Sequence, residues 1–496
     1  MPHMSFVAYG AFKKERSFFM KKISEFFKAI GRYFKNFGVA FAKGDIWVKL
    51  SAVIMGAGYF ARKQIVNGLI MLIVEAAFVL MCVGYAAPNL AKFGTLGTVK
   101  FEQVFDPLTM QTTTNNYDNS FQILLNSVVA LFIILIFVLF YIHNIKTVYK
   151  LQQMKENGEH INTFKEDMKA LFNEKFHITL LTLPTIGVVI MNIPILILIA
   201  VAFTNYDQQH LPPNSLFTWV GFKNFASLFS NSMTVTFGYS FRKVLGWTLV
   251  WAVMATFTTF IGGILLAKAI NSKTTKLPKM WRTLFIISIA VPQFVTLLLV
   301  RNFFADSGIV NTICSNIGIT DMLKHAGLVG EHLTYIPFLT DPHWAKVMII
   351  LINIWVGVPY QMLIATGVLM NIPTDQIESA KIDGATNFQV FWKITMPYIL
   401  FIQGPALITD FVKNINNFNV IYLLTQDVFV TQNQALANSH AKEVDLLVTW
   451  LFRLTNEYYD YKMASVIGII VFIICAAFTL ISFSRMIAGD KEEEYQ

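Results

Sequence analysis

Charged residues are scarce in this chain, and their scarcity excludes a soluble globular protein. Only 14% of the 496 residues are Asp, Glu, Lys or Arg, whereas 55% are hydrophobic. The mean hydropathy is +0.53. A soluble domain carries about 25% charged and ~45–50% apolar residues. The composition therefore indicates a polytopic membrane protein.

Residue patterns that carry chemistry are also missing. The three cysteines, Cys82, Cys314 and Cys475, are isolated in the sequence, so neither a disulfide framework nor a metal site is expected. The sequence contains no Gly-rich phosphate loop, no metal-ligand spacing and no nucleophile elbow. We therefore expect no catalytic residue, no metal and no cofactor in this chain, so that work is driven by a partner. No cleavable signal peptide is evident either.

Positive charge exceeds negative charge, with a net charge of +9, and much of the excess lies in residues 1–64 and in short loops. Cytoplasmic loops of membrane proteins show this distribution, so we do not expect nucleic acid as a partner. Within residues 1–64, basic and apolar side chains alternate near helical spacing. This pattern is typical of an interfacial helix on an anionic bilayer surface. The region is predicted to be basic, amphipathic and cytoplasmic or interfacial.

Hydrophobic segments of membrane-spanning length recur along the chain. A spanning helix needs about 20 apolar residues. About eight segments qualify: residues 65–85, 121–143, 178–203, 244–270, 284–304, 347–370, 398–419 and 465–483. We predict an all-α polytopic fold. Glu75, inside the first span, should face other helices or be protonated, and Pro292 should kink the fifth.

These spans suggest a division of the chain. Residues 65–177 are predicted to hold two accessory helices and a cytoplasmic loop, and residues 178–487 a six-helix core. Residues 488–496 form a cytoplasmic tail. Starting from a cytoplasmic N-terminus, six crossings place residues 372–397 in the cytoplasm and eight place the C-terminus there.

Residues 372–397, IPTDQIESAKIDGATNFQVFWKITMP, form a polar island between two spans. Thr374 is expected to cap a helix, and Asp383 and Gly384 to supply a turn. Small side chains such as Ala380 let a partner approach closely, so the island is either a docking helix pair or an ordinary polar loop.

The spacing of residues in this island resembles the EAA loop of ABC-importer membrane subunits. The matching residues are Glu378-Ser379-Ala380, Asp383-Gly384-Ala385, Phe391, Ile394 and Pro397. The family consensus begins Glu-Ala-Ala, so Ser379 departs from it. The resemblance implies a coupling helix in a cleft of an ATPase subunit. Glu378 would make a polar contact there, Gly384 the turn, and Ala380 and Ala385 the close approach.

The seventh span carries many polar residues: Asp410, Lys413, Asn414, Asn416, Asn417 and Asn419. Such groups face the bundle interior or a water-filled path. They either hydrogen-bond between helices or line a hydrophilic cavity, and their number favours the cavity. Asp410 and Lys413, three residues apart, can pair on one face. Trp355 and Tyr360 of the sixth span add aromatic faces, which together with amides suit a neutral polyhydroxyl ligand.

Three further patterns are similar to the larger membrane subunit of maltose/maltodextrin importers, over roughly residues 178–487. They are Asn353-x-Trp355-x-Gly357-x-Pro359-Tyr360, Asn414-x-Asn416-Asn417-Phe418 and Asp445-Leu446-Leu447-Val448. The resemblance implies that sugar is bound by Asn353, Val356, Gly357, Tyr360, Asn414, Asn417 and Asn419, with Asp410 and Lys413 at neighbouring matched positions.

The resemblance also implies partners. A second homologous permease subunit would complete the pathway, two ATPase subunits would use ATP and Mg, and an extracellular binding protein would deliver the oligosaccharide. The short outer loop after the third span suits a lipid-anchored binding protein, as in Gram-positive bacteria. The expected location is the bacterial cell membrane, with both termini cytoplasmic and transport by alternating access.

Other functions stay open. An importer of the same family could carry another sugar or glycerol phosphate. An ion-coupled secondary transporter would need a coupling-ion site and inverted repeats, neither of which is clear in the sequence. A membrane-embedded transferase would need catalytic carboxylates at the membrane edge.

Overall fold

The computed structural model describes residues 24–493, apart from residues 26, 27, 30, 107–110, 231–236, 273 and 427. Residues 1–23 of the predicted basic N-terminal region lie outside the described residues, and so do residues 494–496 of the predicted tail. The chain divides into two compact units, Met1–Val220 and Gly221–Gln496. The division predicted at residue 178 stays a prediction.

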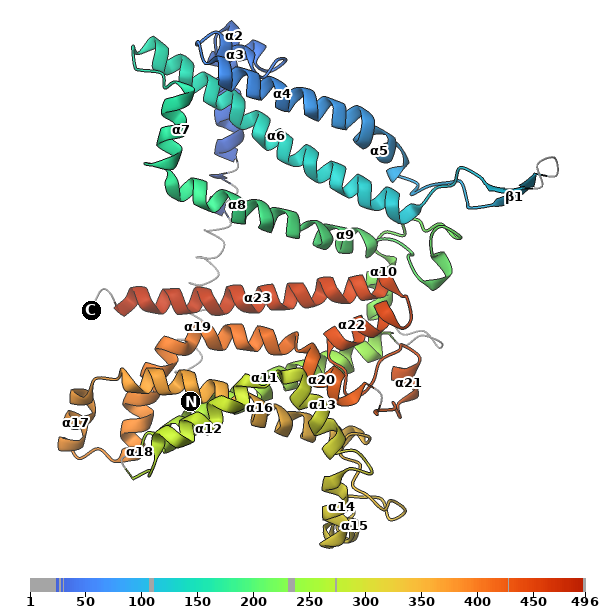
Figure 1. The fold of residues 1–496 in the computed structure, drawn as a ribbon, viewed down its shortest axis with the longest axis vertical. Helices are drawn as coiled ribbons and strands as arrows, with labels where there is room; N and C mark the ends of the chain where they lie inside the picture. The colour runs from blue at the N-terminus through green and yellow to red at the C-terminus, as the bar shows by residue number, and fades with distance from the viewer. Residues whose placement is uncertain are drawn as a thin grey trace, which may run out of the picture. The chain divides into compact units, whose positions relative to one another are not determined.

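The first unit is built from long apolar helices (Figure 1). After a helical stretch at residues 31–43, its helices are α2 (Ile46–Leu50), α3 (Ala57–Phe60), α4 (Ile65–Met81), α5 (Ala87–Phe93), α6 (Ser120–Glu156), α7 (Phe164–Phe172), α8 (Phe176–Met191) and α9 (Ile193–Val201). A π-helical turn, Cys82–Ala86, joins α4 to α5. The Glu75 carboxylate in α4 accepts a hydrogen bond of 2.9 Å from the backbone N–H of Met55. This intramembrane acid therefore has a partner within the protein.

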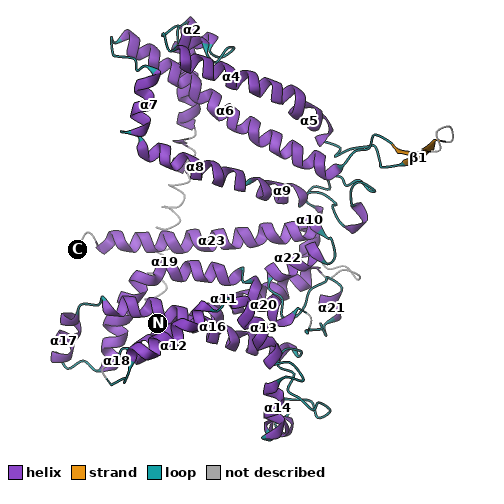
Figure 2. Ribbon diagram, in the orientation of Figure 1, coloured by secondary structure: helices purple, strands orange, loops and turns teal. Residues whose placement is uncertain are grey.

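A short hairpin interrupts the polar segment between α5 and α6. Its strands, β1 (Gln103–Asp106) and β2 (Gln111–Thr114), pair antiparallel (Figure 2). At its base, Asp118 accepts 2.6 Å from Lys92 Nζ and 2.9 Å from the backbone N–H of Thr98. These hydrogen bonds lower the pKa of Asp118 to about 2. The carboxylate is therefore charged at neutral pH and anchors the segment.

The second unit contains the remaining helices. They are α10 (Lys223–Phe229), α11 (Phe237–Ile270), α12 (Pro278–Ala290), α13 (Gln293–Phe303), α14 (Ile309–Asn316), α15 (Ile319–His325), α16 (Pro342–Met370), α17 (Thr374–Ile382), α18 (Asn387–Val390), α19 (Met396–Ile415), α20 (Phe418–Thr425), α21 (Gln434–Ala437), α22 (Leu447–Asn456) and α23 (Tyr461–Glu493). A π-helical segment, Phe391–Thr395, joins α18 to α19.

The core of this unit is the crossing of α11 and α16, where small residues bring the two backbones together. A Cβ atom added to Gly263 would lie 2.4 Å from Gln361 Cβ, and one added to Gly357 would lie 2.8 Å from Thr259 Cγ2. Only glycine allows such an approach between membrane helices. The crossing thereby fixes the wall of α16 that carries the predicted site.

Within the described residues, seven helices are long and apolar enough to span a membrane: Ile65–Phe93, Ser120–Glu156, Phe176–Val201, Phe237–Ile270, Pro342–Met370, Asn387–Thr425 and Tyr461–Ser484. The bent pair α12 and α13 counts as an eighth if it is one span. The predicted all-α polytopic fold is confirmed.

Candidate functional site

Two helix breaks lie close together in the second unit. The axis of α12 turns by 92° into that of α13 at Pro292, where the sequence predicted a kink. The seventh predicted span, residues 398–419, lies within the spanning segment Asn387–Thr425, but its helix is interrupted inside that segment. Helix α19 ends at Ile415, and the Asn417 side chain caps α20 by accepting 3.3 Å from the N–H of Val420. Asparagine side chains compete with the helix for backbone groups and favour such starts.

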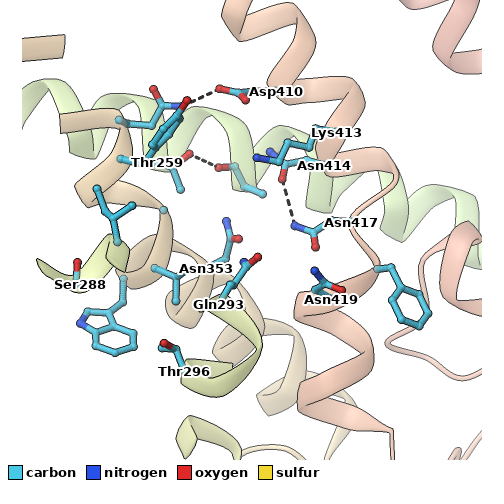
Figure 3. Close-up of a pocket in the computed structure, with 18 of the residues that line it drawn as sticks. Thr259, Ser288, Gln293, Thr296, Asn353, Asp410, Lys413, Asn414, Asn417 and Asn419 are labelled. Carbon is cyan, nitrogen blue, oxygen red and sulfur yellow. Dashed lines mark hydrogen bonds between the residues drawn. The ribbon is translucent and has the colours of Figure 1, made fainter. Parts of the chain in front are cut away.

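A cavity of about 500 Å³ opens between the two breaks and is completed by α11 and α16. Every residue predicted to bind substrate lines it: Asn353, Val356, Gly357, Tyr360, Asp410, Lys413, Asn414, Asn417 and Asn419. In Figure 3 the amide side chains of Gln293, Asn353 and Asn419 face the same space. The structure thus assembles residues of separate spans into one wall, while their binding of a substrate stays a prediction.

The amide side chains of the cavity are tied to each other and to α11. Asn414 Nδ2 donates 2.9 Å to the hydroxyl of Thr256. Asn414 Oδ1 accepts 3.4 Å from Asn417 Nδ2 (Figure 3). Each amide keeps further donor and acceptor capacity. The arrangement can therefore bind hydroxyl groups through side chains that are already oriented.

The two charged residues of the cavity are held differently. Asp410 Oδ2 accepts 2.7 Å from Gln361 Nε2, across from α19 to α16. Lys413 lies in the last turn of α19, where the helix dipole favours a cation. No ion pair joins Asp410 to Lys413 among the residues that the structure describes. Asp410 contacts Gln361 instead of pairing with Lys413.

Sequence reasoning missed part of the wall. Thr259, Ser288, Gln293, Thr296 and Gln361 also line the cavity. All are uncharged polar residues inside hydrophobic segments, which is the signal that identified the asparagines of the seventh span. In the fifth span, the polar residues on both sides of Pro292 carry this signal and mark a second cavity wall.

The polar island forms two helices, α17 and α18, which lie at the end of the unit away from α20 (Figure 1). Thr374 does not cap α17: Pro373 precedes the helix and Thr374 is its first residue. The expected turn is present at Gly384, whose φ is +83°. Its N–H donates 3.1 Å to Lys381 O, and the N–H of Ala385 donates 2.9 Å to Ala380 O. This is a glycine-terminated Schellman motif.

The helix pair presents both polar and apolar side chains. Glu378, Ser379, Asp383 and Gly384 are exposed, while Ala380 and Ala385 are half-buried. Ile382, Phe388 and Trp392 are 86%, 72% and 50% exposed. Large exposed apolar groups on a polar helix pair are typical of an interaction surface. The contact of the six predicted coupling residues with an ATPase stays a prediction.

A polar cavity inside a bundle of membrane-spanning helices is typical of a solute-transport protein. The family model described as "Binding-protein-dependent transport system inner membrane component" matches residues 259–488. The chain belongs to this family of membrane permeases, as the sequence resemblance predicted.

Curated relatives match along nearly the whole chain. It is 34% identical over 448 residues to the maltodextrin transport system permease protein MdxF of Bacillus subtilis, covering 90% of this chain and 96% of that protein. The same identity and coverage hold for the maltodextrin permease MalC of Streptococcus pneumoniae. The galactooligosaccharides permease GanP of Bacillus subtilis is 32% identical over 447 residues, covering 90% and 98%.

Proposed function

We propose that this chain is the membrane-spanning subunit of an ATP-driven importer that carries maltodextrin-type oligosaccharides by alternating access. The cavity between the broken helices carries the proposal. Its asparagines supply donors and acceptors for sugar hydroxyls, and the side chains of Trp355 and Tyr360, 59% and 49% exposed, supply faces for sugar C–H groups. The relatedness to maltodextrin permeases supports the same substrate class.

The helix pair α17–α18 is proposed to contact an ATPase subunit. The exposed Ile382 and Phe388 favour a protein partner, and Glu378 is positioned on the surface for a polar contact. The sequence has no phosphate loop. ATP and Mg would therefore be used by two ATPase subunits, and this chain would be neither an enzyme nor a holder of a cofactor. Closure of the ATPases would move α17 and α18 and open the cavity outward.

Two further partners complete the proposed assembly. A second, homologous permease subunit would supply the other half of the pathway. An extracellular binding protein, anchored by lipid, would deliver the sugar. The Bacillus and Streptococcus relatives favour a Gram-positive cell membrane. Both termini are proposed to be cytoplasmic, with the basic residues before residue 64 on the inner leaflet.

The proposal is tested by the ATPase activity of the reconstituted complex, with its partner subunits and binding protein, against a panel of solutes. We expect maltose or longer maltodextrins to stimulate hydrolysis while unrelated sugars leave it unchanged. Stimulation by another solute alone would keep the importer and replace the substrate. An intact complex that no solute stimulates would favour an ion-coupled carrier.

Galactooligosaccharides are the second candidate substrate. The galactooligosaccharides permease matches 90% of this chain, as the maltodextrin permease MdxF does. Its sequence identity to this chain is 32%, compared with 34% for MdxF. Both substrates are neutral oligosaccharides that an amide and aromatic wall accommodates. Galactooligosaccharides therefore belong in the panel, and stimulation by them alone would select this candidate.

A further inference from the structure

The break between α19 and α20 leaves backbone carbonyl groups without helical partners inside the span. The last four carbonyls of a helix have no intrahelical donor, and a membrane interior offers little water to replace it. Val412 O accepts from the N–H of Asn416 at 3.3 Å and from its side-chain Nδ2 at 3.1 Å. Asn414 O accepts 3.2 Å from the N–H of Asn417. The break is thus closed largely by its own residues.

One donor comes from a different helix. The indole Nε1 of Trp251, on α11, donates 3.1 Å to Asn414 O. Trp251 is completely buried. Thr256, on the same helix, accepts 2.9 Å from the Asn414 side chain. Helix α11 therefore holds Asn414 by its backbone and by its amide at once.

We propose that Trp251 is a positioning residue for the solute-binding cavity. Its indole N–H fixes the end of α19, so that the Asn414 and Asn417 amides face the solute in one orientation. Trp251 does not itself line the cavity, although Ala255, one turn further along α11, does. The inference rests on the proposed function for the identity of the solute.

Two other tryptophans show what distinguishes Trp251. The indole of Trp247 donates 3.1 Å to Val444 O, and that of Trp450 donates 2.9 Å to Ser439 O. All three thus bind backbone carbonyls, but neither Val444 nor Ser439 lines the cavity, whereas Asn414 does. Loss of the indole N–H should therefore lower the affinity for solute at Trp251 but leave it unchanged at Trp247 and Trp450.

The experiment compares Trp251→Phe with Trp450→Phe in the reconstituted complex. Each substitution removes one indole N–H from a completely buried ring and keeps an aromatic side chain. We expect Trp251→Phe to raise the sugar concentration for half-maximal ATPase stimulation by roughly three- to tenfold, the effect of one lost hydrogen bond. The maximal rate and the amount of assembled complex should stay near wild type. Trp450→Phe should leave the half-maximal concentration unchanged.

Removing both amides separates positioning from general packing. If Trp251 acts by orienting the Asn414 and Asn417 amides, adding Trp251→Phe to Asn414→Ala/Asn417→Ala should weaken the response no more than Asn414→Ala/Asn417→Ala alone. Equal shifts in Trp251→Phe and Trp450→Phe, multiplying effects in the triple variant, or a Trp251→Phe complex that does not assemble would each overturn the inference. A wild-type complex that no sugar stimulates would instead overturn the proposed function.

Discussion

The contact between Gln361 and Asp410 places a carboxylate in the cavity wall with one defined donor. Gln361 is 9% exposed, and its Nε2 lies 2.7 Å from Asp410 Oδ2. Gln361→Leu would remove the donor and leave the carboxylate. A hydrogen bond to a charged group contributes roughly 1.5–3 kcal/mol, so we expect a lower midpoint when the purified complex is heated and its remaining assembled fraction is measured by size-exclusion chromatography.

Adding Asp410→Leu to Gln361→Leu provides the control. Removing both partners leaves no unpaired acceptor, so the double variant should recover part of the lost thermal stability. A double variant that is less stable than Gln361→Leu would contradict this account. Sugar-stimulated ATPase is not the readout here, because both residues line the cavity.

Single residues could be predicted where the sequence itself marks them as unusual. Clustered amides in a hydrophobic segment identified Asn414, Asn417 and Asn419 as candidates, and a family resemblance added Asn353. All four residues line the cavity. The partner of Asp410 could not be predicted. Lys413 is three residues away along the chain, whereas Gln361 belongs to another helix, and sequence spacing reports only neighbours on the same helix.

At the scale of elements, the turn between α17 and α18 depends on one glycine. Gly384 has a φ of +83°, and no atom lies within 4 Å of the position of an added Cβ atom. Gly384→Ala therefore adds backbone strain alone, roughly 1–2 kcal/mol. We expect it to misplace α17 and to reduce sugar uptake in cells, with normal amounts of the protein in the membrane.

Gly384→Asn is the matched control for that turn. Asparagine tolerates the left-handed conformation better than alanine does, so uptake should fall less than in Gly384→Ala although the side chain is larger. Equal uptake in both variants and the wild type would argue against docking by this helix pair and would favour a secondary carrier.

The sequence predicted which segments form spanning helices better than it predicted where those helices are interrupted. Hydropathy identifies a segment long enough to span the membrane, and the eight predicted segments correspond to the observed spans if α12 and α13 are one span. It does not reveal where a helix stops inside such a segment. The break at Asn416 and Asn417 arises because both side chains bind nearby backbone groups. A further donor to Asn414 O, the indole of Trp251, comes from α11, and sequence spacing does not report contacts between helices.

At the scale of the whole molecule, a single helical path connects the proposed docking surface with the cavity. Helix α18, the π-helical segment and α19 follow one another without interruption from Asn387 to Ile415. Phe391, near the start of this path, is buried, and the ammonium of Lys268 lies 4.1 Å from its ring centre. Asp410 and Asn414 lie near its other end. A displacement of α18 can therefore reach the cavity along one continuous helical path.

This connection predicts that flexibility in the middle of α19 uncouples transport. Phe401 and Ile402 are 62% and 43% exposed, and replacing both with glycine weakens the helix by about 1 kcal/mol per residue relative to alanine. We expect the Phe401→Gly/Ile402→Gly complex to assemble and to keep its basal ATPase activity. Its rate of sugar uptake should fall roughly tenfold. The matched variant Phe401→Ala/Ile402→Ala loses the same apolar side chains but keeps residues of high helix propensity, so its uptake should stay close to that of the wild type. If the glycine pair and the alanine pair lost uptake equally, the exposed side chains themselves would matter. A connection through the backbone of α19 would then no longer explain how the helix pair α17–α18 and the cavity communicate.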